Sequence, residues 1–307
     1  MDIRQMIGRS TVILDGGMST ALRDHGADLS GPLWTARALT DDPDSVVAAH
    51  LDFLRAGARV VITASYQASI EGLGRAGIDA DRAELLLRRS VELAAQARAR
   101  FLDERPAAGT ILVAGSIGPY GAMLAGGQEF TGDYGDGIGR AELAAFHEPQ
   151  IDVLLDAGAD LLAAETLPRV DEAGAIVDAL RTRPEGRAWL SFTCRDGRTA
   201  GGDPIEDAVR LADRADQIVA VGVNCTPPDQ VAGLLRTIRR ASGKPLIAYP
   251  NAGGVWDAST RSWAAATRDR FDRDEIRSWV DAGADVVGGC CGIGAAGINA
   301  VATSVRG

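Results

Sequence analysis

AGARVVI at residues 56–62 returns twice farther along the chain, as AGADLLA at 157–163 and as AGADVVG at 282–288. Each copy follows a segment whose apolar residues recur three and four positions apart, which is the spacing of an amphipathic helix. Glycine is the residue that most often ends a helix, and the apolar and β-branched residues after it are typical of a buried strand. The pattern predicts helices joined to parallel strands by very short loops.

The same alternation extends over the whole chain. Short β-rich runs recur between longer segments with helical spacing, at TVILDG (11–16), RVVITAS (59–65), ILVAGS (111–116), DLLAAET (160–166), AWLSFT (188–193), IVAVGVNC (218–225), PLIAYPN (245–251) and DVVGGC (285–290). Repeated βα units with short αβ loops favour a closed parallel barrel over two smaller domains. We therefore expect a single (β/α)8 TIM barrel domain over residues 1–307.

A doubly wound open sheet is the rival fold, because GIGAAG (292–297) follows a predicted strand and matches the dinucleotide-binding pattern G-x-G-x-x-G. That motif requires a βαβ unit and an acidic residue about 20 positions onward, and the sequence after Gly297 holds neither. The segment is interpreted as a glycine-rich loop before a last helix. An anion-binding role is the alternative, since loops after barrel strands 7 and 8 often hold phosphate.

The composition excludes several classes of function. The formal net charge is −10, and no run of five or six basic residues occurs, so neither nucleic acid nor an anionic membrane is expected as a partner. No apolar run approaches the roughly 18 residues that span a bilayer, and the first residues lack the pattern of a secretory signal. Four cysteines are too few for a disulfide framework in a chain of 307 residues. A cytoplasmic protein with reduced thiols is expected.

Barrel enzymes carry their chemistry at the carboxyl ends of the strands. Polar and sulfur groups gather at these ends in this sequence, namely Asp15, Thr63 to Gln67, Ser116, Glu165 with Thr166, Cys194, Asn224 with Cys225, Asn251, and Cys290 with Cys291. The connections from 116 to about 140 and from 251 to about 272 are long and lack periodicity, which is typical of lids and binding loops. We expect both to overhang the same mouth of the barrel.

Three cysteines come from neighbouring parts of the predicted rim. Cys225 ends the sixth strand, and Cys290 with Cys291 ends the eighth. A catalytic zinc ion commonly takes three protein ligands and leaves a fourth position for water or substrate. The alternative is that these are small buried core residues, because cysteine is often buried without a role. Cys194 also ends a strand, and we interpret it as an inert buried thiol rather than a fourth ligand.

The chain resembles the homocysteine S-methyltransferase family, whose members share a zinc barrel. The resemblance is carried in order by LDGGMSTAL, ITASYQA, GSIGPYGA, AETLP, GVNC, YPNAG and GGCC. Within the family it is most similar to the bacterial branch that uses S-methylmethionine, on the evidence of ITASYQAS and GPYGAMLAGGQEFTGDYG. The chain departs from its relatives in GIGAAG, where a threonine-rich turn is common, and in the alanine before Glu165, where a cysteine is common.

The resemblance implies an activity and a set of site residues. The expected reaction moves a methyl group from a sulfonium donor, S-methylmethionine or S-adenosylmethionine, to the thiol of L-homocysteine and forms methionine. Cys225, Cys290 and Cys291 are expected to bind Zn2+, which activates the substrate thiol. Glu165 and Asn224 are expected to hold the amino acid group of homocysteine, and Asp15 of the LDG motif to join them.

For two of these residues a purely structural role is the alternative. An unpaired carboxylate at an apolar strand end is costly, so Glu165 needs a cation, either the substrate ammonium or a nearby arginine. The amide of Asn224 either contacts the substrate or only braces its loop.

The donor side of the site is expected to be aromatic, because a sulfonium is attracted to aromatic rings. Trp34, Tyr66, Phe130 and Tyr134 are the candidates, with simple packing as the alternative for each, and Gln67 is expected to contribute a polar contact. Two other functions compete with the methyltransferase. One is a metal-free barrel lyase or isomerase with Glu165 as the base, and the other is a non-catalytic zinc- or thiol-binding protein.

Overall fold

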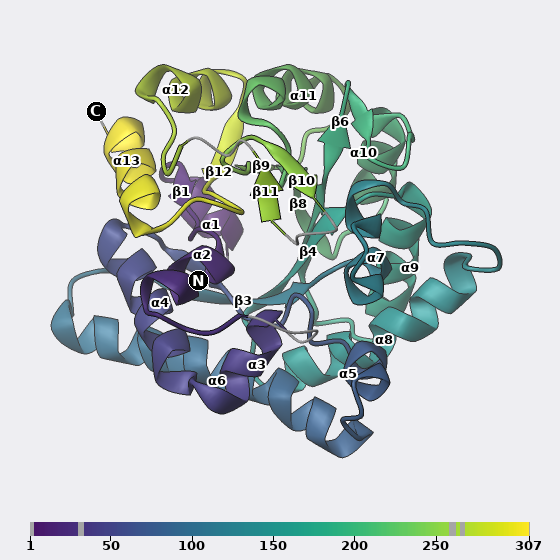
Figure 1. The fold of residues 1–307 in the computed structure, drawn as a ribbon. Coiled ribbons are helices and arrows are strands. Elements are labelled where there is room, and N and C mark those ends of the chain that lie inside the picture. The colour runs from purple at the N-terminus through teal and green to yellow at the C-terminus, as the bar shows by residue number, and fades with distance from the viewer. Residues whose placement is uncertain (1–2, 30–33, 258–261, 265–267, 307) are drawn as a thin grey trace.

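The computed structural model describes residues 3–29, 34–257, 262–264 and 268–306, and it contains a parallel barrel of eight strands. Figure 1 looks along the barrel, with the strands inside a ring of helices. The barrel strands are β1 (Val12–Ile13), β2 (Val60–Ile62), β3 (Leu112–Ile117), β4 (Leu161–Leu167), β5 (Ala188–Phe192), β8 (Ile218–Asn224), β9 (Leu246–Tyr249) and β12 (Ala284–Val287). Every predicted strand is present, and the predicted (β/α)8 barrel is confirmed.

The barrel closes between its first two strands. The hydrogen-bonded order is β1-β12-β9-β8-β5-β4-β3-β2, so β1 and β2 are the two edges of the sheet. A parallel bridge pairs Leu14 with Val60, and the N–H of Asp15 donates to the carbonyl of Val60 at 3.1 Å. These contacts join the edges and leave no exposed strand edge at this seam.

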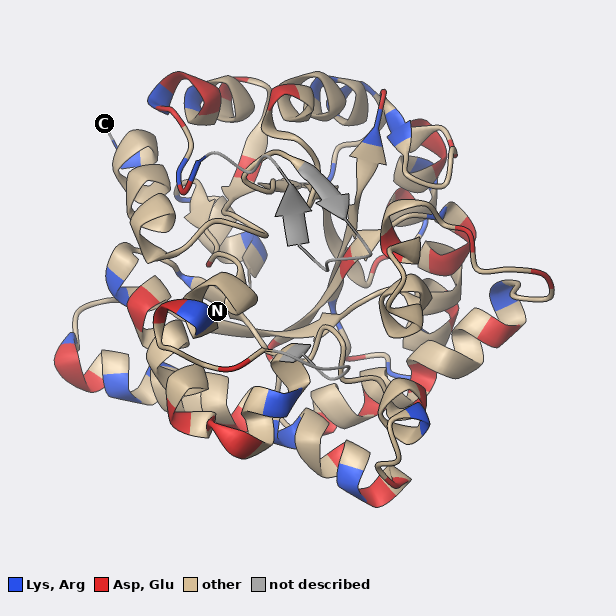
Figure 2. Cartoon of the chain, in the orientation of Figure 1, with Lys and Arg blue, Asp and Glu red and all other residues tan. Residues whose placement is uncertain are grey.

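One long helix follows each barrel strand and packs outside it. These helices are α4 (Pro43–Ala56), α6 (Ala80–Glu104), α8 (Arg140–Asp156), α9 (Val170–Leu180), α10 (Ile205–Asp213), α11 (Pro228–Ala241), α12 (Arg273–Asp281) and α13 (Ala295–Arg306). Figure 2 shows that the charged residues lie mainly on these outer helices. None of the helices among the described residues is long and apolar enough to span a membrane.

The three repeated AGA phrases end three of these helices. Gly57 after α4, Gly158 after α8 and Gly283 after α12 have φ angles of 118°, 92° and 100°. Only glycine adopts this left-handed conformation at little cost, so each one stops its helix and turns the chain into the next strand. The short loops predicted from the phrase are confirmed.

A short N-terminal helix, α1 (Ile3–Ile7), covers one mouth of the barrel. Its residues Ile3 and Met6 pack into the cluster that fills the barrel interior, together with residues such as Leu14 and Trp189. The Arg4 guanidinium donates to the carbonyls of Asp216 and Ile218, at the amino end of β8. This mouth is therefore closed by apolar packing, and the opposite mouth remains for chemistry.

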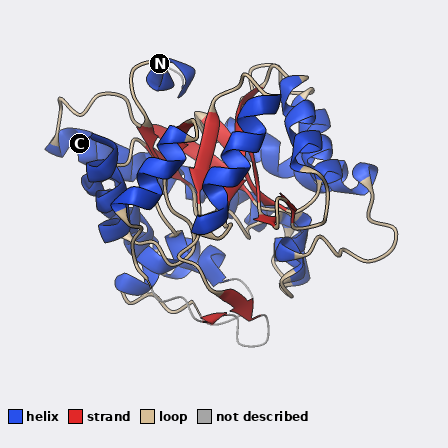
Figure 3. Ribbon diagram, turned by 90° about the horizontal axis from the view of Figure 1, so that it is seen from above, coloured by secondary structure: helices blue, strands red, loops and turns tan. Residues whose placement is uncertain are grey.

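The remaining elements lie in the connections that follow the carboxyl ends of the strands. They are α2 (Met18–Asp24), α3 (Trp34–Asp41), α5 (Ile70–Arg75), α7 (Tyr120–Leu124), the 3-10 helix η1 (Gln128–Phe130), and the hairpins β6 (Cys194–Arg195) with β7 (Arg198–Thr199) and β10 (Val255–Asp257) with β11 (Ser262–Ala264). Figure 3 shows the N-terminus at one end of the barrel and the β10–β11 hairpin at the other. Both long connections predicted as lids carry such elements.

Candidate active site

Three cysteine side chains converge at the open mouth of the barrel. The Sγ atoms of Cys225 and Cys291 are 3.6 Å apart, and those of Cys290 and Cys291 are 4.0 Å apart. All three sulfurs lie within 4.8 Å of one another, and none of these cysteines forms a disulfide. Strand β9 lies between β8 and β12 in the sheet, so the barrel brings together residues that are 65 positions apart in the sequence.

The backbone of Cys225 is held in an unusual conformation by its neighbours. Its φ angle is 46°, in the left-handed region that non-glycine residues seldom adopt. Its N–H donates to the Tyr249 carbonyl at 3.2 Å, and its own carbonyl accepts from Asn251 Nδ2 at 2.9 Å and from Thr193 Oγ1 at 3.3 Å. Strain of this kind persists where surrounding contacts over-determine the conformation, and it clusters at functional sites.

Two glycines of the LDGG motif let the double-cysteine turn approach the first strand. A Cβ atom on Gly17 would lie 2.7 Å from the Cys290 carbonyl oxygen, and one on Gly16 would lie 2.3 Å from that of Ile293. The Gly17 N–H donates to the Ile293 carbonyl at 2.9 Å. Any side chain at these two glycines would push the double-cysteine turn away from the rim.

The sulfur cluster fits a tetrahedral metal ion. Zn–S bonds of about 2.3 Å place the sulfurs of a tetrahedral site about 3.8 Å apart, which matches the two measured separations. Contact with the Cys290 thiol, contact with the Cys291 thiol and burial all raise the pKa of Cys225. Three adjacent thiolates therefore need a cation to hold them, and a metal ion supplies one.

Glu165 is a buried carboxylate on the wall of the same mouth. The Ser116 hydroxyl donates to its Oε1 at 2.5 Å. Burial raises the pKa of Glu165 to about 7, while hydrogen bonds from Ser116 and Tyr249 act in the opposite direction. Trp189 Nε1 donates to the Tyr249 hydroxyl at 3.0 Å, so a chain of buried groups fixes the position of this carboxylate.

Glu129 is a second buried carboxylate at this mouth, and no pattern in the sequence singles it out. It lies in η1, within the long connection after β3, and only 6% of it is exposed. Burial raises the pKa of Glu129 to about 7, and the charge of Cys291 adds to this effect. Its Oε2 has no hydrogen-bond partner among the residues that the structure describes.

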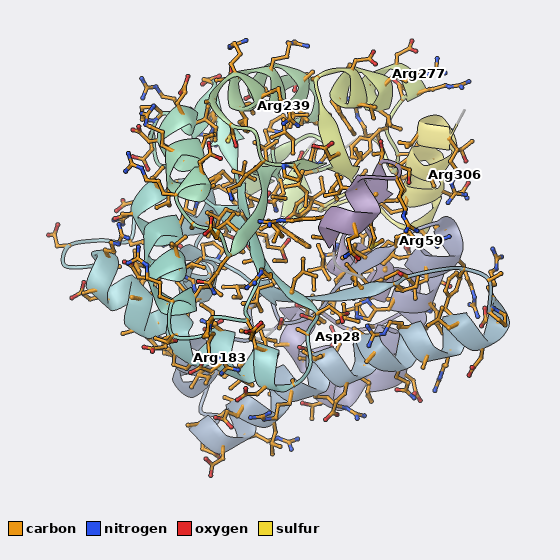
Figure 4. All side chains as sticks on the ribbon, turned by 180° about the vertical axis from the view of Figure 1, so that it is seen from behind. Asp28, Arg59, Arg183, Arg239, Arg277 and Arg306 are labelled. Atoms are coloured by element: carbon orange, nitrogen blue, oxygen red, sulfur yellow. The ribbon has the colours of Figure 1, made fainter. Side chains whose placement is uncertain are left out.

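The thiols and both carboxylates line one cavity of about 130 Å3. The described residues that line it are Gly16, Gly17, Met18, Ser19, Thr35, Ile62, Thr63, Ala64, Tyr66, Gln67, Glu129, Phe130, Glu165, Thr166, Cys225, Tyr249, Gly289, Cys290 and Cys291. Lysine, arginine and histidine are absent from this described lining. In Figure 4 the labelled arginines Arg183, Arg239 and Arg277 lie at the periphery of the barrel.

The family model for homocysteine S-methyltransferases matches residues 12–305, from the first barrel strand to the last helix. The chain belongs to the homocysteine S-methyltransferase family. The resemblance inferred from the sequence motifs is thereby confirmed.

Characterised relatives are similar over nearly their whole length. Homocysteine S-methyltransferase of Escherichia coli is 42% identical over 94% of this chain and 94% of its own. Selenocysteine methyltransferase of Astragalus bisulcatus is 41% identical, over 94% of this chain and 90% of its own.

Solved structures of the homocysteine methyltransferase MmuM from Escherichia coli have the same fold. The metallated form has a TM-score of 0.88 and 40% identity, covering 98% of this chain and 99% of that one. The apo form has a TM-score of 0.80 and 36% identity, with the same coverage. Thus a metal has been seen in a member of the homocysteine S-methyltransferase family that shares this barrel.

The structure brings most of the predicted site residues of this family member to the cavity. The three cysteines line it, and so do Glu165, Tyr66, Gln67 and Phe130. Glu165 has hydroxyl partners, and no arginine approaches it among the described cavity residues. Asp15, Asn224 and Tyr134 are not among the lining residues.

Asp15 lies just behind the cavity wall. Its Oδ2 accepts from the Ile62 N–H at 2.7 Å, and its Oδ1 has no partner in the described part of the chain. Burial, with the charge of Glu165 contributing, raises the pKa of Asp15 well above its usual range. Asp15 thus lies close enough to the predicted substrate residue Glu165 for their charges to interact, and it is not among the described residues that line the cavity.

The Asn224 amide is occupied by the chain itself. Its Oδ1 accepts from the Thr166 N–H at 2.7 Å, and its Nδ2 donates to Thr166 Oγ1 at 2.8 Å. Thr166 has a φ of 59°, so Asn224 connects two left-handed residues, Thr166 beside Glu165 and its own neighbour Cys225. This geometry corresponds to the bracing alternative for Asn224, and its contact with substrate stays a prediction.

Tyr134 faces away from the cavity. Its hydroxyl donates to Glu172 Oε2 at 2.5 Å, and the Arg169 guanidinium lies 4.9 Å from the centre of its ring. Glu172 is fully buried and also accepts from the Tyr120 N–H and from His147. The contacts of Tyr134 hold the loop that bears Glu129, so a donor contact for Tyr134 stays a prediction.

Cys194 and Trp34 complete the predicted set. Cys194 is buried outside the sulfur cluster, where burial raises the pKa of its thiol, in agreement with an inert role. The side chain of Trp34 lies outside the described residues.

The N–H groups of Gly292 and Ile293 in the GIGAAG loop already donate to Thr20 Oγ1 and to the Cys290 carbonyl. These two N–H groups are therefore not free to bind an anion.

Sequence reasoning did not assign a role in the site to Glu129 or Tyr249. It also did not identify Thr166 as the hydrogen-bond partner of Asn224. Tyr249 and Thr166 stand at strand ends, so their positions were available from the strand pattern. Glu129 belongs to no strand end, and its motif, GGQEFTG, marked the loop without indicating which side chain faces inward.

Proposed function

We propose that this chain transfers a methyl group from a sulfonium donor, preferably S-methylmethionine, to the thiol of L-homocysteine and forms methionine. The observation that carries the proposal is a cavity in which three cysteine sulfurs and two buried carboxylates face one space, with no cationic side chain among its described lining residues. A cavity of this charge suits ligands that bring ammonium and sulfonium groups.

We propose zinc as the metal, held by Cys225, Cys290 and Cys291. Three protein ligands leave a fourth position for the substrate sulfur, as in other catalytic zinc sites. When bound, the ion would lower the pKa of the homocysteine thiol and supply a nucleophilic thiolate at neutral pH. Gly17 serves this site by leaving room for the Cys290 carbonyl, and Asn251 serves it by donating a hydrogen bond to the Cys225 carbonyl.

Glu165 would bind the α-ammonium group of homocysteine. The Ser116 and Tyr249 hydroxyls keep its carboxylate directed, and the neighbouring Asp15 adds to the negative potential when it is ionised. A charge-assisted hydrogen bond in a buried place orients the substrate strongly, because few water molecules compete for it. The substrate sulfur would then point toward the cysteine cluster.

The reaction balances as a displacement at carbon. The homocysteine thiol loses its proton, and its sulfur lone pair forms the new bond to the methyl carbon. The bond from that carbon to the sulfonium breaks, and its electron pair stays on the donor sulfur. The products are methionine, a neutral thioether and one proton. Phe130, Tyr66 and Met18 line the cavity and would exclude water from the reacting atoms.

The proposed chemistry needs reduced thiols, so we place the protein in a reducing compartment such as the cytoplasm. We also propose that residues 1–307 work as one domain, because the barrel strands extend from Val12 to Val287.

The test measures zinc in the protein purified under reducing conditions, together with methionine formation from homocysteine. S-methylmethionine and S-adenosylmethionine are compared as donors, before and after chelation and again after zinc is restored. We expect about one zinc per chain and turnover that disappears with chelation and returns with zinc. A protein without metal would contradict the zinc site, and a zinc protein that uses neither donor would contradict the methyltransferase.

A further inference from the structure

Glu129 is a buried carboxylate on the cavity wall whose Oε2 has no partner among the described residues. Leaving a buried charged oxygen without a donor is unfavourable, because the group loses its water and gains nothing in return. A buried acceptor of this kind indicates a missing hydrogen-bond donor, and Glu129 is one of the residues that line the cavity.

The position of Glu129 is determined by the loop and its supports. A Cβ atom on Gly121 would lie 2.5 Å from the Glu129 nitrogen, so η1 packs directly against the backbone of α7. The loop is held from outside by Glu172, which accepts hydrogen bonds from the Tyr120 N–H at 2.6 Å and from the Tyr134 hydroxyl at 2.5 Å. The loop therefore presents Glu129 to the cavity in a defined position.

Glu172 and Glu129 show the difference between a structural and a ligand-binding carboxylate. Glu172 lies in the same region, is fully buried and has donors from the chain on both of its oxygens. Glu129 is almost as buried, and burial raises its pKa. The described lining contains no basic side chain, so none of the described cavity residues pairs with Glu129 as a cation.

The chemistry of the missing partner is that of an ammonium group. A sulfonium carries positive charge but has no N–H or O–H, so it cannot donate a hydrogen bond to Oε2. An ammonium group offers three donors. The proposed reaction brings one ammonium on homocysteine, assigned to Glu165, and a second one if the donor is itself an amino acid.

Resting on the proposed function, we infer that Glu129 binds the α-ammonium group of the methyl donor. Glu129 thereby selects a donor that is an amino acid as well as a sulfonium. The sulfonium end is left to the aromatic and thioether side chains of Phe130, Tyr66 and Met18, which line the same cavity.

The experiment compares two ligands that differ by the ammonium-bearing carbon. S-methylmethionine and dimethylsulfoniopropionate share the dimethylsulfonium group and a carboxylate, and only the first has an ammonium group. Binding of each is measured by isothermal titration calorimetry to the zinc-loaded wild type and to Glu129→Gln, without homocysteine. We expect the wild type to prefer S-methylmethionine by about 10- to 100-fold. In Glu129→Gln this preference should fall below about threefold.

Glu172→Gln is the matched control, because it loosens the same loop from outside the cavity. Glu172→Gln should weaken the binding of both ligands by a similar factor and keep the preference for S-methylmethionine. Rescue by Glu129→Asp would further support a charge contact. An unchanged preference in Glu129→Gln, an equal loss for both ligands in that variant, or a wild type that does not bind S-methylmethionine would overturn the inference.

The same titrations, together with the assay of methionine formation, separate this inference from the proposed function. If S-methylmethionine binds in a Glu129-dependent way and no methionine forms from homocysteine, the ammonium site stands and the methyltransferase fails. If methionine forms at equal rates in the wild type and in Glu129→Gln, the methyltransferase stands and the ammonium site fails.

Discussion

The cavity has two sides that are built differently. The cysteine side, Cys225, Cys290 and Cys291, comes from the ends of β8 and β12, and its three sulfurs lie within 4.8 Å of one another. The carboxylate side, Glu165 and Glu129, comes from β4 and from a loop helix, and burial raises the pKa of both groups. The first side is organised for a metal ion, and the second side has the charge that a cationic substrate needs.

The side chain of Asn224 joins the two sides. Asn224 precedes Cys225 and accepts and donates hydrogen bonds with Thr166, which follows Glu165. Both Thr166 and Cys225 have left-handed backbones, so this pair of bonds connects the two strained points of the rim. A change at Asn224 should therefore affect both sides.

Loss of a ligand on the cysteine side should have the largest effect. Mutating a residue that only hydrogen-bonds to a metal ligand typically lowers metal affinity or activity by about 10- to 100-fold. Loss of a ligand itself should cost more, so Cys225→Ser should lower zinc affinity and activity by at least about 100-fold. Zinc content and methionine formation are the measurements. Cys194→Ser is the control, because Cys194 is an equally buried thiol outside the cluster, and it should keep the metal. Full zinc and full activity in Cys225→Ser would remove Cys225 from the ligand set.

Loss of charge on the carboxylate side should leave the metal in place. Glu165→Gln should reduce kcat/KM for homocysteine by about 10- to 100-fold, as expected for a lost charge-assisted hydrogen bond. Zinc content should equal that of the wild type. If the variant loses its zinc, the two sides are not independent and Glu165 supports the metal site instead of the substrate.

The pH dependence should come from the same carboxylate. The pKa of Glu165 is raised to about 7, so the group is ionised and binds an ammonium above that pH and becomes neutral below it. At saturating donor, kcat/KM for homocysteine should fall by up to about tenfold for each pH unit below 7. Glu165→Gln should lack this limb of the profile. The same limb in Glu165→Gln would assign it to another group.

A change at the junction should affect both sides moderately. Asn224→Ala removes both hydrogen bonds to Thr166, and we expect about a tenfold loss in zinc affinity together with a higher KM for homocysteine. Zinc competition with a chelator and steady-state kinetics measure the two effects. A raised KM with unchanged zinc affinity would instead support the predicted direct contact of Asn224 with the substrate.

Tyr134→Phe should have the smallest effect on activity. The variant leaves Glu172 Oε2 without the Tyr134 hydroxyl, which should lower the free energy of unfolding by about 1 to 3 kcal/mol. Because Tyr134 does not line the cavity, kcat/KM for the donor should stay within about threefold of wild type. If kcat/KM for the donor fell tenfold or more while the free energy of unfolding stayed unchanged, the result would support the predicted contact of Tyr134 with the donor.

The cysteine side was predictable from the sequence, and much of the carboxylate side was not. Cys225, Cys290, Cys291 and Glu165 stand at the ends of strands, and parallel strands of a barrel bring their carboxyl ends to one rim. Glu129 lies in a loop without periodicity, and no local pattern indicates that it turns inward while Tyr134 turns outward. The amide of Asn224 was equally undecided, because its partner Thr166 is 58 positions away.

The sequence by itself determined the barrel and the rim on which the thiols lie, because helix and strand periods and left-handed glycines act over a few residues. It also indicated the family, through the resemblance of its motifs. The tertiary structure alone decided which loop side chains face the cavity and which hold the loop. That choice depends on contacts such as those of Glu172 with Tyr120 and Tyr134, which form only when distant segments pack together. Burial then sets the charge of Glu129 and Glu165, and burial is a property of the whole fold.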